Sequence, residues 1–256
     1  MKEKGVIYAV SGQKYVKQSR QSVRSLKDKN PHITTVAFVN TDTKKKADMS
    51  HFDRTIEVDK TENKIKVDAI VESPFEVTLY LDTDTYICSD ISGVFNLSSK
   101  FNVAVTHAPI RIFPVGSTNW SGYHVEDVPK SFPEMNTGVI MYDSSEVTKK
   151  LMRDWKSEFE KRYESASKRI PDQPAFRLAL YESGVRHTVL AREYNLRTHV
   201  PSYVDQKVSI IHGEGLNLES IKDSINETKG PRVYIPGLGT ISNNNFLLKI
   251  IRKVMT

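Results

Sequence analysis

The chain has 256 residues, which is enough to bury the core of one α/β domain of ordinary size. No apolar run approaches the length of a membrane span, so an integral membrane segment is not expected. The net charge of +6 could suit a polyanion, but the basic residues are interleaved with acids and no nucleic-acid motif accompanies them. A nucleic-acid partner is therefore not expected either.

Two features bear on the cellular compartment. The N-terminus enters a strand without the apolar region of a signal peptide. The only cysteine, Cys88, excludes an internal disulfide and fits a reducing compartment. Together they predict a cytoplasmic protein, and the oligomeric state is left open.

Strands and helices alternate along the chain. After a strand at 6–10, apolar or small residues recur at positions 15, 16, 19, 23 and 26, which is a helical period. Further strands are expected at 34–39, 54–58, 77–81, 101–106, 137–142 and 208–211. Helices are expected just before Ser73-Pro74, at 146–163 and at 172–182. This alternation predicts an α/β fold, with one domain and a mainly parallel central sheet flanked by helices.

The strand at 77–81 ends in two carboxylates, Asp82 and Asp84, separated by Thr83. Burying carboxylates is costly unless something positive meets them, and hard divalent cations prefer oxygen ligands. Ligands of open α/β sheets also bind at the carboxyl ends of strands. The triplet therefore predicts a metal site for a phosphorylated ligand, although an acidic pair at a strand end can also form a turn or cap a helix.

Four segments, in this order, resemble the GT-A glycosyltransferases, especially the retaining, family 8-like group that includes glycogenin and bacterial galactosyltransferases. They are residues 66–86 with the acidic triplet, 132–142 with Asn136-Thr137-Gly138, 171–174 with Asp172-Gln173, and 210–213 with His212. The resemblance implies a Rossmann-like GT-A domain over residues 1–256. It also implies a nucleotide-binding part at about 1–106, followed by an acceptor loop and C-terminal part at about 107–256.

The resemblance further implies site residues. Mn²⁺ (or Mg²⁺) would be held by Asp82, Asp84 and His212. Asp172, Gln173 and Asn136 would act at the reacting sugar. Contacts to the donor are implied for Tyr8, Ala9, Val10, Tyr15, Lys66, Asp82, Thr83, Asp84, Thr137, His212, Gly213 and Gly215.

Several of these residues also have purely structural interpretations. Asp172 at a helix start could be an N-capping acid, and Tyr15 could be the inner face of the first helix. Asn136 and Thr137 could form a turn before a strand. A histidine that ends an apolar strand, as His212 does, is often a hydrogen-bonded residue at the edge of the core.

The segment between residues 107 and 135 is long, poor in strand patterns and rich in aromatic residues. Long irregular segments of compact domains are often binding loops, and aromatic rings stack on sugars. The acceptor residues predicted here are His107, Trp120 and Tyr123. The alternative is that these side chains only hold the loop in place.

The chain departs from the family pattern after His212. Relatives commonly continue into Gly-x-x-Lys-Pro-Trp, whose lysine meets the donor phosphate, whereas this chain continues Gly213-Glu214-Gly215. The residue that neutralises the phosphate is therefore unassigned. Lys222 and the helix that carries Lys66 are candidates.

The predicted function is metal-dependent transfer of a sugar, with retention, from a nucleotide diphosphate sugar to an acceptor glycan, protein or small molecule. A UDP-sugar is the favoured donor. One alternative is a sugar-phosphate nucleotidyltransferase, which should carry a glycine-rich basic loop after the first strand, and residues 9–14 match such a loop poorly. The other is an inactive nucleotide-sugar-binding domain, which would be expected to lose Asp82 and Asp84.

Overall fold

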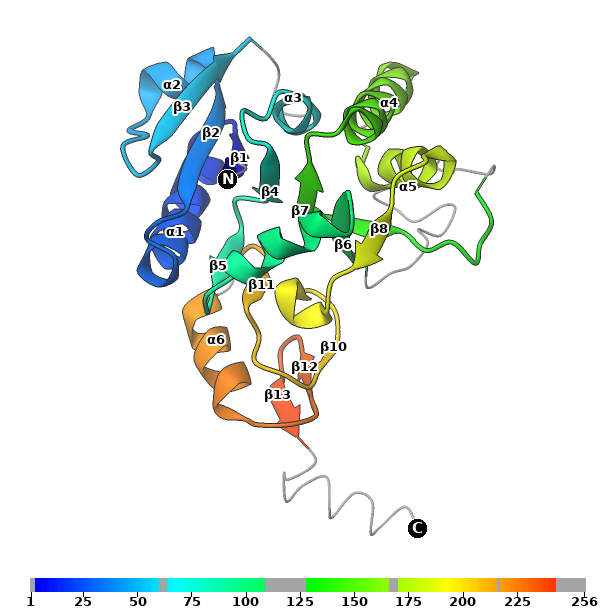
Figure 1. The fold of residues 1–256 in the computed structure, drawn as a ribbon. Helices are drawn as coiled ribbons and strands as arrows, with labels where there is room; N and C mark the ends of the chain where they lie inside the picture. The colour runs from blue at the N-terminus through cyan, green and yellow to red at the C-terminus, as the bar shows by residue number, and fades with distance from the viewer. Residues whose placement is uncertain (1–2, 60–63, 109–127, 166–169, 216, 243–256) are drawn as a thin grey trace.

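The computed structural model describes residues 3–59, 64–108, 128–165, 170–215 and 217–242 (Figure 1). The elements before the acidic triplet are β1 (Lys4–Val10), α1 (Gln13–Lys29), β2 (Thr34–Asn40), α2 (Thr41–Lys46), β3 (Arg54–Val58), α3 (Ile65–Val71) and β4 (Val77–Leu81). The middle of the chain forms β5 (Thr85–Ile87), the 3₁₀ helix η1 (Ser92–Ser99), β6 (Val103–His107), β7 (Met135–Asp143), α4 (Glu146–Ser165) and α5 (Gln173–Glu182). The remaining elements are β8 (His187–Val189), η2 (Arg192–Tyr194), β9 (Leu196–Arg197), β10 (Ser202–Val204), β11 (Ile210–His212), α6 (Leu218–Glu227), β12 (Arg232–Ile235) and β13 (Gly239–Ser242).

Seven strands form the central sheet, in the order β3-β2-β1-β4-β7-β6-β8. All neighbouring strands are parallel except at β7, which runs antiparallel to both β4 and β6. The predicted α/β fold with a mainly parallel sheet is confirmed. Some strands of this sheet precede residue 106 in the sequence and others follow it. The proposed nucleotide-binding part therefore shares one sheet with the rest of the chain.

Alternation along the strands places a core on each face of this sheet. In β1, Val6, Tyr8 and Val10 pack with α1 and η1, whereas Ile7 faces the opposite core with α3, α4 and α5. Successive strand residues point to opposite faces, so a strand buried on both sides is apolar throughout. All five residues of β4 are buried for this reason, and its polar continuation emerges at the edge of the sheet.

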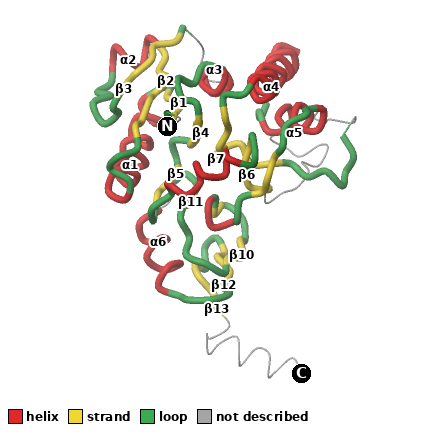
Figure 2. Tube along the Cα trace, in the orientation of Figure 1, coloured by secondary structure: helices red, strands yellow, loops and turns green. Residues whose placement is uncertain are grey.

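Two small three-stranded sheets, β5-β11-β9 and β10-β12-β13, lie with α6 below the central sheet in the view of Figure 2. Their strands have only two to four residues each. Such short strands carry almost no periodic signal, and of these six strands only β11 lies in a region where the sequence predicts one. The β5-β11-β9 sheet matters most for function because it carries His212 to the end of β4.

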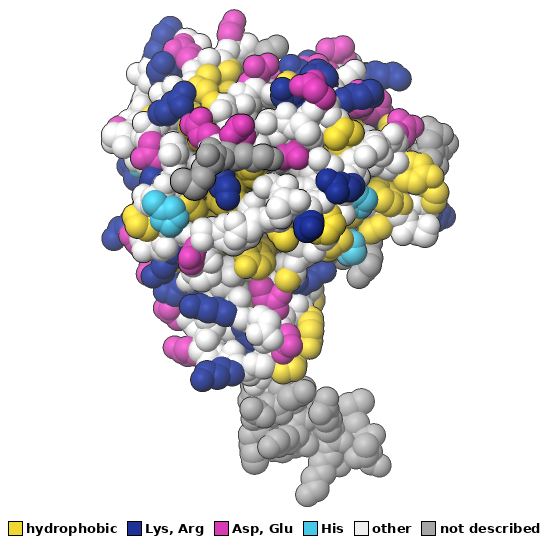
Figure 3. All heavy atoms as spheres, in the orientation of Figure 1, with side chains coloured by type: hydrophobic (Ala, Val, Ile, Leu, Met, Phe, Trp, Pro, Cys, Tyr) yellow, Lys and Arg dark blue, Asp and Glu magenta, His cyan; other side chains and the backbone are white. Residues whose placement is uncertain are grey.

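Among the described helices, none combines the length and apolar character needed to cross a membrane. On the face drawn in Figure 3, Lys and Arg side chains lie among Asp and Glu side chains. This mixing agrees with the interleaving of basic and acidic residues along the sequence.

Candidate active site

The two carboxylates of the acidic triplet are held by a turn at the end of β4. The backbone N–H of Asp82 donates to the carbonyl of Gly138 on β7 over 2.8 Å. The hydroxyl of Thr85 then closes the turn by donating to the carbonyl of Asp82 over 2.9 Å. The side chains of Asp82 and Asp84 stay 28% and 19% exposed, so both remain within reach of a ligand.

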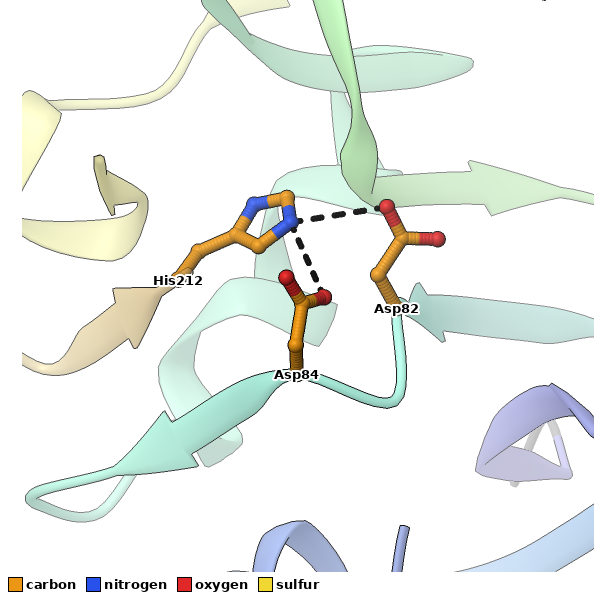
Figure 4. A group of neighbouring side chains, drawn as sticks. All are labelled: Asp82, Asp84 and His212. Atoms are coloured by element: carbon orange, nitrogen blue, oxygen red, sulfur yellow. Dashed lines mark ion pairs between the residues drawn. The ribbon is translucent and has the colours of Figure 1, made fainter. Parts of the chain in front are cut away.

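Strand pairing brings His212 to these acids. β11 runs antiparallel to β5 with His212 opposite Thr85, and the N–H of Gly213 donates to the carbonyl of Asp84 over 3.0 Å. Nε2 of His212 then lies 3.5 Å from Oδ2 of Asp82 and 3.3 Å from Oδ1 of Asp84 (Figure 4). Two atoms that each bind one ion at about 2.1 Å lie about 3 Å apart when they meet it at a right angle. The two distances from Nε2 are close to this value, and the ligand atoms of all three side chains lie within 4.8 Å of one another, so the group could hold a divalent cation.

A chain of hydrogen bonds sets the tautomer of His212. The N–H of Gly138 can only donate, so the atom of Asn136 that it meets at 3.2 Å must be Oδ1. The same Oδ1 accepts from Nδ2 of Asn195 over 2.8 Å, which turns the Oδ1 of Asn195 toward Nδ1 of His212 at 2.9 Å. Nδ1 of His212 is therefore the protonated nitrogen, and the lone pair of Nε2 faces the two acids. A metal-binding histidine needs this arrangement.

Lys66 supplies the positive charge beside the acids. Its Nζ lies 3.3 Å from Oδ1 of Asp82 and 3.1 Å from Oδ2 of Asp172, and it donates to Oγ1 of Thr137 over 3.1 Å. Burial opposes ionisation of Asp82, but the charge of Lys66 and a hydrogen bond from the Tyr80 hydroxyl outweigh it and hold its pKa well below the usual range. Burial likewise opposes the charge of Lys66, but Asp172 and Asp82 outweigh it, so the pKa of Lys66 is raised.

Asp172 and Gln173 begin α5 and face the same cavity. Asp172 occupies the N-cap position but makes no capping hydrogen bond through its side chain, because its carboxylate is turned to Lys66. The indole N–H of Trp155 donates to the carbonyl of Asp172 over 3.0 Å and fixes the helix start. Nδ2 of Asn136 donates to Oε1 of Gln173 over 2.7 Å. This bond joins Gln173 to the series of hydrogen bonds that ends at His212.

These side chains line a cavity of about 560 Å³. It is bounded by Lys14, Tyr15, Lys66, Asp82, Asp84, Asn136, Thr137, Asp172, Gln173, Arg197, His212 and Glu214, among others. An adjoining hollow of about 220 Å³ extends it to Ala9, Ser11 and Thr83. A larger hollow of about 730 Å³ between Lys4, His32 and η1 has no carboxylate in its lining, so it is the weaker candidate for metal-dependent chemistry.

Some residues that the sequence predicts to contact the donor are buried in the core or do not line the cavity. Tyr8 is fully buried, and its ring packs edge-on against Phe52 while its hydroxyl pairs with Ser22, so a base cannot stack on it. The Val10 side chain is also in the core. Neither Gly213 nor Gly215 lines the cavity of about 560 Å³ or the adjoining hollow that extends it.

Of the three predicted acceptor residues, His107 is the one in the described part of the chain. His107 ends β6 and pairs through its backbone with Met135, but it does not line the cavity. Trp120 and Tyr123 lie outside the described residues, so their predicted contact with the acceptor stays a prediction.

The structure adds residues that the sequence interpretation missed. A Cβ on Gly138 would overlap the ring of His212 and lie 2.6 Å from Oδ2 of Asp82, so only glycine fits there. Gly138 could have been found as the last residue of the Asn136-Thr137-Gly138 motif. Asn195 lies between η2 and β9, and Arg197 ends β9; these elements are too short to give a sequence signal.

Comparisons with known proteins bear on the family and the fold. A family model described as nucleotide-diphospho-sugar transferase matches residues 20–215. No curated protein matches. Among solved structures, the glycosyltransferase GlyE of Streptococcus pneumoniae TIGR4 is 15% identical with a TM-score of 0.50, over 77% of this chain and 48% of that one. This chain therefore spans about half the length of GlyE.

Two structures of LgtC are also similar. An active-site mutant of LgtC is 11% identical with a TM-score of 0.54, over 83% of this chain and 88% of that one. The galactosyltransferase LgtC in complex with donor and acceptor sugar analogues is 10% identical with a TM-score of 0.53, over 82% of this chain and 87% of that one. At these identities the likeness concerns the fold, which is the fold that the sequence predicts.

Proposed function

The chain belongs to the nucleotide-diphospho-sugar transferase family and is a glycosyltransferase, and from this premise we propose a specific reaction. It transfers a sugar from a nucleotide diphosphate sugar, with a UDP-sugar favoured, to an acceptor glycan, protein or small molecule. The reaction depends on a divalent metal and retains the configuration of the anomeric carbon. A cytoplasmic location is part of the proposal, supported by Cys88, which is buried and unpaired.

One observation carries this proposal, namely the convergence of Asp82, Asp84 and His212 on one point of the cavity. Two carboxylate oxygens and an imidazole lone pair form a donor set that suits Mn²⁺, and Mg²⁺ less well because it prefers oxygen ligands. When bound, such an ion offsets the negative charge of the leaving diphosphate. Asn195 supports the metal site by fixing the ring of His212.

The other residues divide the cavity between base, phosphates and sugar. Tyr15 and Ala9 line the β1 end, where the base would lie, and Tyr15 offers an aromatic face there. Lys66 lies between the metal site and α5, where it meets the phosphates or the sugar hydroxyls. Asn136, Thr137 and Gln173 line the adjoining wall, where amide and hydroxyl groups orient the sugar.

The arrangement around the anomeric carbon favours attack from the same face as the leaving group. Asp172 is held by Lys66, and Gln173 is a neutral amide that accepts from Asn136, so neither is an activated nucleophile. In the proposed step, the acceptor oxygen bonds to the anomeric carbon as the bond to the diphosphate oxygen breaks. The diphosphate takes up the acceptor proton, and Gln173 orients the sugar during the exchange.

A nucleotide-sugar screen tests this function. Wild-type protein with Mn²⁺ should release a nucleoside diphosphate from at least one UDP-sugar, and a chelator should abolish the release. Asp82→Asn and Asp84→Asn should abolish it as well while their circular dichroism spectra stay unchanged. Asp90→Asn, which changes an exposed acid that accepts from the N–H of Ser92 away from the cavity, is the matched control.

Two outcomes would contradict the proposal. One is near-normal turnover by Asp82→Asn or in the presence of chelator, which would exclude the metal-dependent reaction. The other is a product with inverted configuration, detected by NMR of the new glycosidic bond, which would exclude retention while leaving the metal site in place.

A further inference from the structure

Three cationic side chains line the cavity, and two of them are already matched by acids. Nζ of Lys14 lies 2.5 Å from Oε2 of Glu214, and Lys66 lies between Asp82 and Asp172. The third cation is Arg197. Within the described part of the chain, its guanidinium takes part in no hydrogen bond and no ion pair.

Arg197 lies next to the metal site by strand pairing. β9 runs parallel to β11, and Arg197 is the register partner of His212. Arg197 and Asp84 line the same cavity. The side chain of Arg197 is half-buried, so part of its hydration has been given up without a protein group to replace it. Such a cation is poised for an anionic ligand.

We propose that Arg197 binds the diphosphate of the nucleotide sugar. This inference rests on the proposed function and names a further donor-binding residue for it. A guanidinium presents five N–H donors in a planar fork that suits phosphate oxygens, and it stays charged throughout the physiological pH range.

The charges in the cavity support this assignment. A divalent ion held by Asp82 and Asp84 would leave Lys66 paired with Asp172, while Lys14 is paired with Glu214. Arg197 is then the cation of the cavity lining whose charge is left for the ligand. Lys222, a candidate from the sequence, does not line the cavity, and its Nζ pairs with Asp223 over 2.9 Å.

Binding experiments with two probes test the inference. UDP carries the diphosphate, and uridine carries only the base and ribose. In the presence of Mn²⁺, Arg197→Ala should weaken UDP binding about 10- to 100-fold, the effect of losing hydrogen bonds to a charged group. Uridine binding, followed by saturation-transfer NMR, should not change. Arg24→Ala, at an exposed arginine of α1 outside the cavity, should bind both probes like wild type.

Arg197→Gln keeps most of the side-chain volume and should show the same loss of UDP binding, so it provides the test if the alanine variant does not fold. Titration of Mn²⁺ alone serves as a second readout and should give similar affinities for wild type and Arg197→Gln. Equal UDP affinity in wild type and both variants would overturn the role of Arg197 and leave the proposed function intact. Wild-type protein that binds neither probe would overturn both.

Discussion

Gly138 packs directly against the imidazole of His212, with no room between them for a Cβ. The same backbone accepts a hydrogen bond from the N–H of Asp82 over 2.8 Å and donates one to Asn136 over 3.2 Å. One glycine on β7 therefore sets the distance between two of the three metal-binding side chains. It also orients the amide chain that fixes the histidine tautomer.

Gly138→Ala should consequently displace His212 or Asp82. We expect the Mn²⁺ affinity to fall about 10- to 100-fold, the range seen when groups that support metal ligands are changed. Isothermal titration with Mn²⁺ measures the effect. Gly93→Ala is the control, since a Cβ at that position meets nothing within 4 Å. An unchanged Mn²⁺ affinity in Gly138→Ala would show that the site does not need this close contact.

Asn195→Ala should also weaken Mn²⁺ binding, because Nδ1 of His212 loses the acceptor that keeps Nε2 directed at the acids. The expected loss is again about 10- to 100-fold. Asn195→Asp keeps an acceptor for Nδ1 and should retain more affinity than the alanine variant. Long-range ¹H–¹⁵N spectra report the tautomer of the neutral ring. A ring protonated at Nε2 in the wild type would contradict the hydrogen-bond chain.

Lys66→Ala should destabilise the metal-free protein, since it leaves Asp82 and Asp172 without their shared cation. Breaking a fully buried pair costs about 3–5 kcal/mol, and these acids are partly exposed, so we expect a loss of about 1–3 kcal/mol. Mn²⁺ should raise the melting temperature of the variant more than that of wild type, because the ion replaces the missing charge beside Asp82.

Lys64→Ala is the matched control for this experiment. Lys64 pairs with the exposed Glu164 over 3.2 Å and does not line the cavity. Its removal should change stability by less than about 1 kcal/mol. An equal loss of stability in the two variants, or the same Mn²⁺-induced shift in melting temperature, would show that Lys66 does not balance the charge of Asp82 and Asp172.

The pH dependence of stability should reflect Asp82. The pKa of this carboxyl is depressed in the folded protein, whereas an unfolded chain has an Asp pKa of about 3.9. Ionised Asp82 therefore contributes stability above about pH 4, and this contribution declines as the pH falls further. The difference in unfolding free energy between wild type and Asp82→Asn should shrink from pH 6 to about pH 3. Urea denaturation measures it, and parallel pH profiles would contradict the depressed pKa.

The sequence by itself determined the fold class and the part of the site that lies in recognisable sequence motifs. Long strands such as β1, β2 and β4 are buried on both faces, so they read as continuous apolar runs whatever their partners are. Asp82 and Asp84 stand out because such a run ends on them. The order of the motifs identifies four more site residues, and the structure brings all of them to one cavity. They are Lys66, Asn136, Asp172 and His212.

Only the tertiary structure decided which residues complete that cavity. Arg197 is brought to His212 by the pairing of β9 with β11, and Asn195, which directly precedes β9, meets His212 through its side chain. These strands are two and three residues long and carry no periodic signal. The burial of Tyr8 likewise depends on α1 and Phe52 covering its ring, which a strand pattern does not specify. The local sequence pattern indicates which side chains of one segment are buried. The partner that meets a polar side chain is set by segments far away in sequence, and here they meet through short strands and single hydrogen bonds.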